Sequence, residues 1–574
     1  MPNPLWILRA FLARLKRRYT SLWHIIHART AKPQKIPVEF AHHVEPRSIG
    51  SYEIGEELKQ GQFFFAGKQV DVPGDAIWKI ASPSSDFTAD MHGFNWLDDL
   101  AAVGDSRARI LAQTWVLEWI ERYSNGKGPG WTPALTGRRV LRICAHGEFL
   151  FNRLEAHRAG LIFHSLARQV SFLEKSWRYE VGSWPRLEAL TGLIFAGVCF
   201  DGRARSLHRA NKAIGAEAVQ KISADGAIST RNPEELMELF TLYTWVMRTL
   251  EDAGETPDPR LVTALENIAP TLRSLRLGDG SLARFHGGGR GREGRLDQVL
   301  SDSRMRGNRT GDLAMGFERL TSGRITVLVD CACPPPFTFS QHAHASTLAF
   351  EMSSGRFPVV VNCGAGQKFG PEWEHVCRET GAHNTIVLGG VSSAKMAPDG
   401  YVSQTFGQRL LHMPDNVTRK RAADHLGVAL QASHDGYNAV HHRHLHLSPD
   451  GREFTGQEHF SASKSARTAQ STTFEAHFHL HPNVRAKIAD DKQTIALQLP
   501  NKEVWTFRQN GGEMTLEDSV YLDQWRLKPR ATKQIVVSGA IVQYAGQINW
   551  IFKRVKDGAR TAAVERNAQT PMTQ

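Results

Sequence analysis

The stretch QHAHASTLAFEMSSGRFPVVVNCG, residues 341–364, decides how the C-terminal half of the chain is expected to fold. Apolar residues alternate with polar ones along it, and a β-branched run ends at Asn362. This period of two is typical of strands that bury one face in a core. His342 and His344 stand at positions i and i+2, so on a strand their imidazoles share a face. They indicate either a metal or catalytic site, or polar residues on an ordinary strand.

The same period recurs over residues 312–556. Clear examples are RITVLVDCA at 324–332, HLGVALQASH at 425–434 and INWIFKRV at 548–555. Turn residues separate these segments, and no helical pattern lies between them. They therefore predict a large antiparallel β-sandwich. The polar tail at 557–574 is expected to be disordered.

A period of three to four residues marks the preceding part of the chain. Segments such as RARILAQTWVLEWIERY and ELMELFTLYTWVMRTLEDA, between residues 86 and 280, carry apolar residues at helical spacing. They predict an all-helical domain built as an α/α array or toroid. Residues 33–85 look irregular, with short strand candidates. The Gly-rich segment 281–311 is expected to be a linker, because it lacks the Lys-Ser/Thr ending of a phosphate-binding loop.

Composition and charge narrow the range of partners. The chain has 574 residues, a formal net charge of +12 and six cysteines. A chain this long is expected to form more than one domain. The positive charge favours an acidic polysaccharide or an anionic membrane surface, and no nucleic-acid-binding motif is visible. Six cysteines in so long a chain do not indicate a disulfide framework.

Residues 1–32 predict a basic amphipathic helix. Most of its basic residues lie off the apolar face, and no acidic residue precedes Glu39. The pattern indicates either a helix lying on anionic lipid or a helix docked on its own domain with its basic face in water. It is not a usual signal peptide, and no segment is apolar enough to span a bilayer. The apolar face consists of Leu5, Leu8, Leu12, Leu15, Tyr19 and Leu22.

A candidate zinc site can be assembled from the strand region. Asn362 ends the strand that follows His344, and His383 begins another strand in RETGAHNTIVLGG. Two imidazoles and one oxygen ligand suit zinc with an open position. An amide is a poorer zinc ligand than a carboxylate. The alternative is therefore a hydrogen-bonded network of the same three residues without an ion.

Five segments follow one another in a characteristic order: LRLGDGSLARFHGGG, QHAHASTLAFEMSSGRFPVVVNCG, RETGAHNTIVLGG, ASHDGYN and FEAHFHLHP. In this order they resemble the heparinase II/III family of polysaccharide lyases, whose relatives include alginate and oligoalginate lyases. The resemblance covers residues 85–555. It implies a multidomain α + β fold, with an N-terminal incomplete (α/α) toroid followed by a large antiparallel β-sandwich. It also implies an acidic glycan held in a cleft between the two.

The resemblance assigns roles to residues of the sandwich. It implies that His342, the first histidine of the HxH motif, belongs to the active site. In the family, the second histidine, an aspartate and the histidine of AHNT hold a structural zinc. These positions correspond to His344, Asn362 and His383. Asn362 replaces the aspartate, so a structural zinc is implied only as a possible cofactor.

The toroid half departs from the family at its catalytic positions. Family members neutralise the substrate carboxylate with an Asn or His on one helix and transfer protons with a Tyr on a later one. The matching helix reads WPRLE, where Trp184 and Pro185 replace Asn and His and Glu188 is retained. Glu235 occupies the place of the tyrosine, and Tyr243 lies two turns further along. The catalytic candidates are His342, Glu188 and Tyr243.

Four further residues are candidates for binding substrate. Arg186 and Arg231 are suited to neutralising a uronate carboxylate, although Arg186 and Glu188 are equally consistent with surface charges. His434 and Tyr437, in the segment SHDGY, match a family segment of the sandwich. They either line the cleft or form a tight turn.

Together these implications predict an acidic-polysaccharide lyase that cleaves a uronate-containing glycan by β-elimination. The alternative is a catalytically degenerate lyase-fold protein that binds anionic glycan or acts in cell-envelope assembly, since a fold does not establish a function. A third hypothesis is a membrane-surface or scaffold protein anchored by residues 1–32. The resemblance favours the periplasm or membrane surface, and the lack of a clear export signal leaves the cytoplasm as the alternative.

Overall fold

The computed structural model describes residues 4–33, 35–48, 50–72, 77–180, 182–307, 313–437, 439–462, 471–523, 528–541 and 547–555. Their contacts divide the chain into two compact units. The helical unit consists of Met1–Gly226, Glu238–Ala269 and Gln298–Gly307. The strand unit consists of Ala227–Met237, Pro270–Asp297 and Asn308–Gln574.

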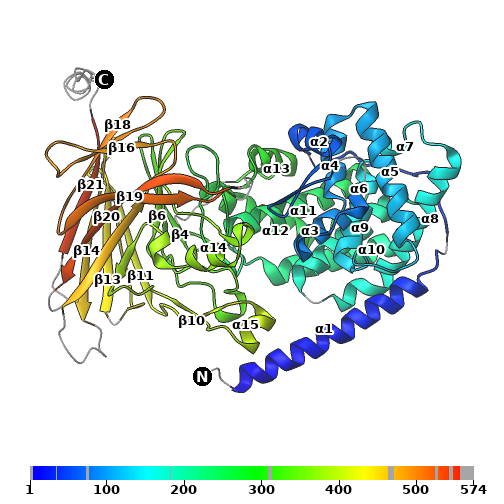
Figure 1. The fold of residues 1–574 in the computed structure, drawn as a ribbon, viewed down its shortest axis with the longest axis horizontal. Helices are drawn as coiled ribbons and strands as arrows, with labels where there is room; N and C mark the ends of the chain where they lie inside the picture. Colours follow the sequence, from blue (N-terminus) through cyan, green and yellow to red (C-terminus); the bar gives the residue numbers. More distant parts are fainter. Residues whose placement is uncertain are drawn as a thin grey trace. The chain divides into compact units, whose positions relative to one another are not determined.

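Helices make up most of the helical unit (Figure 1). Polar caps start several of them: the Asp105 side chain accepts from the Ala108 N–H, and that of Thr132 accepts from the Leu135 N–H. A short hairpin, β1 (Gln62–Phe65) and β2 (Lys68–Asp71), precedes the main array. The helices are α1 (Pro4–Thr30), α2 (Tyr52–Lys59), α3 (Ser85–His92), α4 (Asn95–Val103), α5 (Ser106–Tyr123), α6 (Pro133–Ala145), α7 (Gly147–Phe151), α8 (Ala156–Ser176), α9 (Ser183–Cys199), α10 (Ala204–Lys221), α11 (Pro233–Asp252) and α12 (Pro259–Ser274).

Facing glycines let α6 and α9 cross closely. A Cβ atom on Gly137 would lie 2.2 Å from the carbonyl oxygen of Glu188, and one on Gly192 would lie 2.6 Å from the Cα of Gly137. Larger residues would force the two helices apart. Between α4 and α5, the fully buried rings of Trp96 and Trp115 pack edge to face, with centroids 5.1 Å apart.

Three antiparallel sheets dominate the strand unit (Figure 1). The largest has the order β11-β12-β13-β14-β21-β18-β17-β16, the next β3-β4-β5-β6-β7, and the smallest β19-β20-β15-β8. The strands are β3 (Leu313–Ala314), β4 (Phe317–Ser322), β5 (Ile325–Asp330), β6 (Phe350–Ser354), β7 (Phe357–Val360), β8 (Ile386–Leu388), β11 (Val417–Asp424), β12 (Gly427–His434), β13 (Ala439–Leu447), β14 (Glu453–Ala462), β15 (Thr472–His479), β16 (Arg485–Ile488), β17 (Ile495–Gln498), β18 (Val504–Asn510), β19 (Glu513–Tyr521), β20 (Arg530–Ile541) and β21 (Gln547–Arg554).

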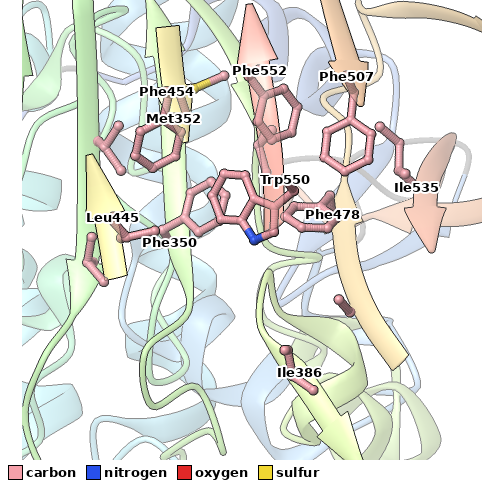
Figure 2. Packing of buried hydrophobic residues seen from close by; sticks show 14 of the residues in the cluster. Phe350, Met352, Ile386, Leu445, Phe454, Phe478, Phe507, Ile535, Trp550 and Phe552 are labelled. Atoms are coloured by element: carbon pink, nitrogen blue, oxygen red, sulfur yellow. The ribbon is translucent and has the colours of Figure 1, made fainter. Parts of the chain in front are cut away.

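An aromatic cluster forms the centre of the sandwich core (Figure 2). The ring of Trp550 stacks on Phe350 with centroids 5.6 Å apart, and it meets Phe454 and Phe478 edge to face. These residues come from four different strands. Phe454 and Trp550 lie at inward positions of strands whose burial alternates, whereas Phe350 lies on β6, which is buried at every position.

Helices and strands lie where the spacing of apolar residues predicted them. Among the described residues, those between 86 and 280 are mainly helical and those between 313 and 555 mainly form antiparallel strands, which confirms the predicted fold class. The expectation that no helix lies between the strands is wrong, because α14 (Pro371–Val376) and α15 (Tyr401–Phe406) do so. Residues 33–85, expected to be irregular, contain α2 as well as the short hairpin. The predicted tail at 557–574 lies outside the described residues.

Residues 281–307 of the Gly-rich segment are more ordered than the linker expected there. They contain the helix α13 (Arg295–Ser303), and His286 is buried. Arg284 ties the segment to β6, because its backbone N–H and its guanidinium both donate to the buried carboxylate of Glu351. Sequence composition alone did not indicate this long-range ion pair.

Candidate functional site

His342 is the catalytic candidate whose side chain is most open to solvent. It is 44 % exposed, and its Nδ1 lies 3.3 Å from Oε1 of Glu374. Glu374 lies on the short helix α14 (Pro371–Val376). The contact with His342 lowers the pKa of Glu374 more than partial burial raises it. An imidazole and a carboxylate paired at the surface can exchange a proton with a bound molecule.

His344, the second histidine of the motif, is buried and paired with another imidazole. Its Nδ1 lies 2.9 Å from Nε2 of His383, and Nδ1 of His383 lies 2.8 Å from the Glu379 carbonyl oxygen. Since a carbonyl only accepts, His383 is protonated at Nδ1, and its Nε2 accepts from His344. Burial holds the pKa of His344 well below its usual range and lowers that of His383 to about 4. Both imidazoles are therefore neutral at pH 7.

The amide of Asn362 is committed to partners other than these histidines. Its Oδ1 accepts from the backbone and side-chain N–H groups of Asn384, each at 3.1 Å. Its Nδ2 donates to the Arg284 carbonyl oxygen at 3.1 Å. As placed, the three predicted ligands form two separate hydrogen-bonded groups and do not fit a shared zinc ion. Within the described ranges, no cluster of three or more His, Cys, Asp or Glu side chains could hold a metal.

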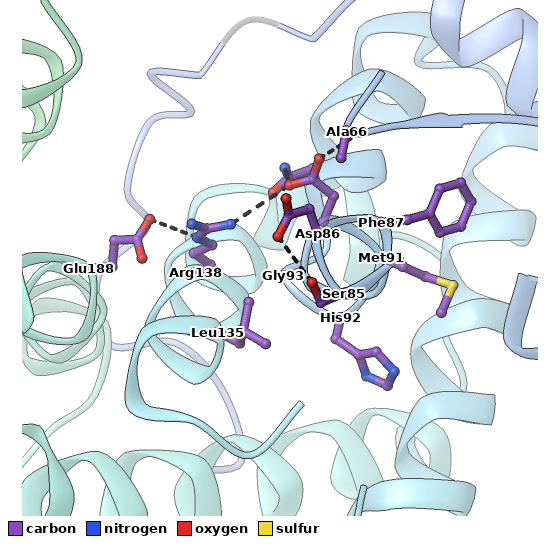
Figure 3. Close-up of polar contacts among 12 residues, drawn as sticks. Ala66, Ser85, Asp86, Phe87, Met91, His92, Gly93, Leu135, Arg138 and Glu188 are labelled. Carbon is purple, nitrogen blue, oxygen red and sulfur yellow. Dashed lines mark hydrogen bonds and ion pairs between the residues drawn. The ribbon is translucent and has the colours of Figure 1, made fainter. Parts of the chain in front are cut away.

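Glu188 is held in an ion pair inside the helical unit (Figure 3). Nε of Arg138 donates to its Oε1 at 2.7 Å, and the indole N–H of Trp184 donates to the same oxygen at 3.1 Å. Burial raises the pKa of Glu188, and the charge of Arg138 opposes that rise. Arg138 comes from α6 and Glu188 from α9, so the pair supports a role in joining two helices rather than the predicted catalytic one.

Arg186 and Tyr243 share Glu217 as a neighbour. Nη1 of Arg186 donates to Oε1 of Glu217 at 2.6 Å. The Tyr243 side chain is fully buried, and burial together with the negative charge of Glu217 raises the pKa of its phenol. A buried phenol with a raised pKa is a poor base at neutral pH, because almost none of it is ionised. The predicted catalytic role of Tyr243 therefore gains no support from this environment.

Arg231 is a structural residue of the strand unit. Its guanidinium donates to the carbonyl oxygens of Met315, Gly316 and Cys333 and pairs with the buried carboxylate of Asp330. A further contact reaches the carbonyl oxygen of Ala332, so all five N–H donors are used. None is left for a substrate carboxylate. This arrangement contradicts the predicted substrate-binding role of Arg231.

His434 and Tyr437 form the tight turn that was the alternative to lining a cleft. The N–H of Gly436 donates to Nδ1 of His434, and the Tyr437 hydroxyl donates to the Ile386 carbonyl oxygen. Nε2 of His434 lies 3.3 Å from Nδ1 of His441, deeper in the sandwich. Burial lowers the pKa of His434 and raises that of Tyr437. Both side chains are engaged with their own unit.

Two partners that sequence reasoning missed now stand beside the predicted residues. Glu374 faces His342, and Arg138 neutralises Glu188. Each is far along the chain from its partner, so no local spacing connects them. The segment PEWEHV, with two acidic residues at a helix start, was the only local hint of Glu374.

A sequence model of the family described as "Heparinase II/III-like, C-terminal" matches residues 309–551. "FtsZ-localized protein C" from Caulobacter vibrioides is 28 % identical over 527 residues, which cover 88 % of each chain. This relative therefore spans both units.

Solved structures share the fold at lower identity. The structure of heparinase III matches with a TM-score of 0.66 and 13 % identity, over 98 % of this chain and 93 % of that chain. A mutant of heparan sulfate lyase HepC from Pedobacter heparinus matches with a TM-score of 0.59 and 14 % identity, over 95 % of this chain and 89 % of that chain. These likenesses confirm the fold class, a helical toroid followed by a β-sandwich. With the match of residues 309–551, they show that the C-terminal part of the chain is similar to the heparinase II/III family.

Proposed function

We propose that this protein is a lyase-fold protein of the cell envelope that works at an anionic membrane surface, on which α1 lies. The observation that carries this proposal is the exposed apolar face of α1. In the described residues, no helix has both the length and the apolar character needed to cross a bilayer. Attachment would therefore be interfacial, along the plane of the membrane.

One face of α1 is docked on the helical unit. Thr20, His24 and Ala28 are buried along it. The guanidinium of Arg168, on α8, donates to the carbonyl oxygen of Ala28 at 3.0 Å, and His24 packs edge to face against Phe172. The helix is thus docked on its own domain, but not as the sequence alternative expected, because the apolar face and not only the basic face is in water.

The face opposite the docked one is apolar and exposed. At 100° per residue, its side chains lie on the far side of the helix from Thr20 and His24. At the same spacing, basic side chains border it on both sides, with Arg9 and Lys16 along one edge and Arg14 along the other, while Arg18 falls within it. The apolar residues, between 42 and 60 % exposed, are Leu5, Ile7, Leu8, Phe11, Leu12, Leu15, Tyr19, Leu22, Ile25 and Ile26.

This combination suits an anionic bilayer. Buried apolar side chains supply most of the binding energy of an interfacial helix, and each Lys or Arg near anionic lipid adds about 1 kcal/mol. A soluble protein partner would need a matching acidic rim, whereas lipid headgroups supply one uniformly. The name of the Caulobacter relative says that it localises with FtsZ, and a position at the cell envelope for this chain is compatible with that name.

Vesicle sedimentation tests the proposal. The full chain should co-sediment with phosphatidylglycerol vesicles and far less with pure phosphatidylcholine, and added salt should weaken the binding. The triple substitution Leu8→Glu, Leu12→Glu, Leu15→Glu should reduce binding at least tenfold. Leu426→Glu alters an equally exposed leucine of the strand unit and should leave binding unchanged. Equal binding by the triple variant and the wild type would refute the proposal.

A second candidate function is the predicted acidic-polysaccharide lyase, and the observation that favours it is the exposed pair His342 and Glu374. β-Elimination needs a base for the C5 proton, an acid for the leaving oxygen and a group that neutralises the carboxylate. The imidazole of His342 is available for proton transfer.

Spectroscopic detection of 4,5-unsaturated uronate tests the lyase candidate. The purified chain is incubated with alginate, heparan-type and bacterial uronate glycans. If product forms, His342→Ala should lower kcat/KM at least about 100-fold, as expected when an acid–base catalyst is removed. His375→Ala, at a neighbouring exposed histidine, is the matched control. Absence of product with every glycan would leave the membrane-surface function alone.

A further inference from the structure

The solvent face of the eight-stranded sheet contains a groove that no part of the proposed function uses. The groove has a volume of about 560 Å³ and crosses five adjacent strands, β12, β13, β14, β21 and β18. Their inward residues belong to the aromatic core, so the groove lies over a rigid floor. Trp550, only 2 % exposed, lies in that floor.

A single row of polar side chains runs across these strands at right angles to them. The strand register pairs Gln431 with His444, His444 with Gln457, Gln457 with Asn549, and Asn549 with Asn510. All five occupy outward positions of the alternating pattern. Neighbouring strands lie roughly 4.8 Å apart, so the row spans roughly 19 Å. That length suits a short extended oligosaccharide.

Hydrogen bonds between the amides fix their orientation. Nε2 of Gln457 donates to Oδ1 of Asn549 at 3.0 Å, and Nδ2 of Asn549 donates to Oδ1 of Asn510 at 3.0 Å. Gln547 also donates to Oδ1 of Asn549. None of these bonds uses Oε1 of Gln457, an acceptor, or Nδ2 of Asn510, a donor, and both residues line the groove. A row of fixed donors and acceptors matches sugar hydroxyls, which both donate and accept.

The groove is poor in charge compared with the rest of the chain, of which 22 % is charged. Among the described residues that line it, Arg508 is the one Asp, Glu, Lys or Arg side chain. Arg508 is itself engaged, since its Nε donates to Oγ1 of Thr494 at 2.8 Å. A polysulfated or polyuronate chain would meet few cations here. Solvent faces of antiparallel sheets are usually rich in charged residues, so this lining is selective for an uncharged ligand.

Imidazole rings border the amide row. His444 and His446 line the groove, and the ring of His444 stands edge-on to that of His459 at 5.8 Å. His442 and His459 stack with centroids 4.2 Å apart. Flat rings beside hydrogen-bonding amides present both surfaces that a pyranose needs, a polar edge and a face for its C–H groups.

We propose that this groove binds a neutral, hydroxyl-rich glycan chain laid across the strands, with Gln457 and Asn549 at its centre. The site is independent of the membrane-surface function and of His342. A peptide added as an extra strand would need a free sheet edge, whereas this row lies in the middle of the sheet. The ordered amides and the low charge therefore favour a saccharide.

Isothermal titration of the full chain with cellotetraose and chitotetraose tests the proposal, with tetragalacturonate as the acidic comparison. At least one neutral tetrasaccharide should bind, and tetragalacturonate should bind at least tenfold more weakly. Gln457→Ala and Asn549→Ala should each weaken neutral binding at least tenfold. Gln69→Ala, on β2 of the helical unit, removes an exposed amide elsewhere and should have no effect.

Thermal melting shows whether the variants stay folded, and imidazole NMR signals supply a second readout. The neutral ligand should shift the signals of His444 and His446 and leave that of His375, on α14, unchanged. Failure of both neutral tetrasaccharides to bind would overturn the proposal. Tighter binding of tetragalacturonate would overturn it too, as would undiminished binding by the folded Gln457→Ala and Asn549→Ala variants.

Discussion

The imidazole of His342 faces the carboxylate of Glu374 across 3.3 Å, although His342 lies in a turn before β6 and Glu374 lies on α14. The contact lowers the pKa of Glu374. We expect His342→Ala to raise the pKa of Glu374 back toward its ordinary value, because the imidazole that stabilises the carboxylate is gone. Carbon-13 NMR titration of the glutamate side chains measures this directly. His375→Ala is the control, and an equal rise in that variant would contradict the pairing.

Asn362 occupies the position at which the resemblance implies a zinc-binding aspartate. The structure commits its amide to Asn384 and Arg284, so we expect less than stoichiometric zinc by elemental analysis and no change in melting temperature with chelator. We expect Asn362→Asp to destabilise the fold by about 1–3 kcal/mol, because its donor to a buried carbonyl is replaced by an acceptor. One zinc per chain, lost together with stability in the His383→Ala variant, would instead establish the predicted metal site.

Buried Glu458 makes the strand unit sensitive to acid. Arg443, His441 and Trp550 all donate to its carboxylate. Burial alone would raise the pKa of Glu458, but the charge of Arg443 and the hydrogen bond from His441 lower it to about 2. Because the folded state lowers the pKa of Glu458, its ionised carboxylate stabilises the fold at every pH above the ordinary pKa of a glutamate. We therefore expect about 3 kcal/mol of stability to be lost as the pH falls from about 4.5 to about 2.

Urea unfolding at a series of pH values measures this dependence. Glu458→Gln should destabilise the unit by about 3–5 kcal/mol at pH 7, because Arg443 is left without its buried partner. The free energy of unfolding of this variant should then no longer fall over the pH range in which the wild type loses stability. Glu513→Gln, at an exposed carboxylate of β19, is the matched control. An unchanged acid transition in the Glu458 variant would show that another group controls it.

The crossing of α6 and α9 depends on glycine. Gly137→Ala would place its Cβ atom 2.2 Å from the Glu188 carbonyl oxygen, so we expect it to destabilise the helical unit by at least about 2 kcal/mol. Gly160→Ala is the control, because a Cβ atom there meets nothing within 4 Å on the exposed side of α8. It should stabilise the helix by about 0.5–1 kcal/mol. Thermal melting of both variants distinguishes the two effects, and equal shifts would contradict the close crossing.

The spacing of apolar residues determined the fold class, because a helix or strand that buries one face must carry apolar residues at its own local period. Helical spacing over residues 86–280 and the two-residue alternation over 312–556 each appear as the expected elements. The Gly-rich segment 281–311 was expected to be a linker, since glycine content reports local freedom. Its residues 281–307 are ordered by the distant carboxylate of Glu351, which composition does not reveal.

The candidate site shows the same division. The sequence placed His344 and His383 together, and they do share a hydrogen bond. The sequence did not reveal that every N–H donor of the Arg231 guanidinium is hydrogen-bonded within the strand unit. Nor did it reveal that Glu374 faces His342.

The sequence by itself determined which residues form helices, strands and core, because those properties depend on neighbours a few positions away. The tertiary structure alone decided which polar side chains are hydrogen-bonded inside the fold and which remain open to a bound molecule. Gln431, His444, Gln457, Asn549 and Asn510 illustrate this, since they come from five strands and became one row only through the sheet register. Cross-strand register depends on contacts between segments distant in the chain, and no local pattern records them.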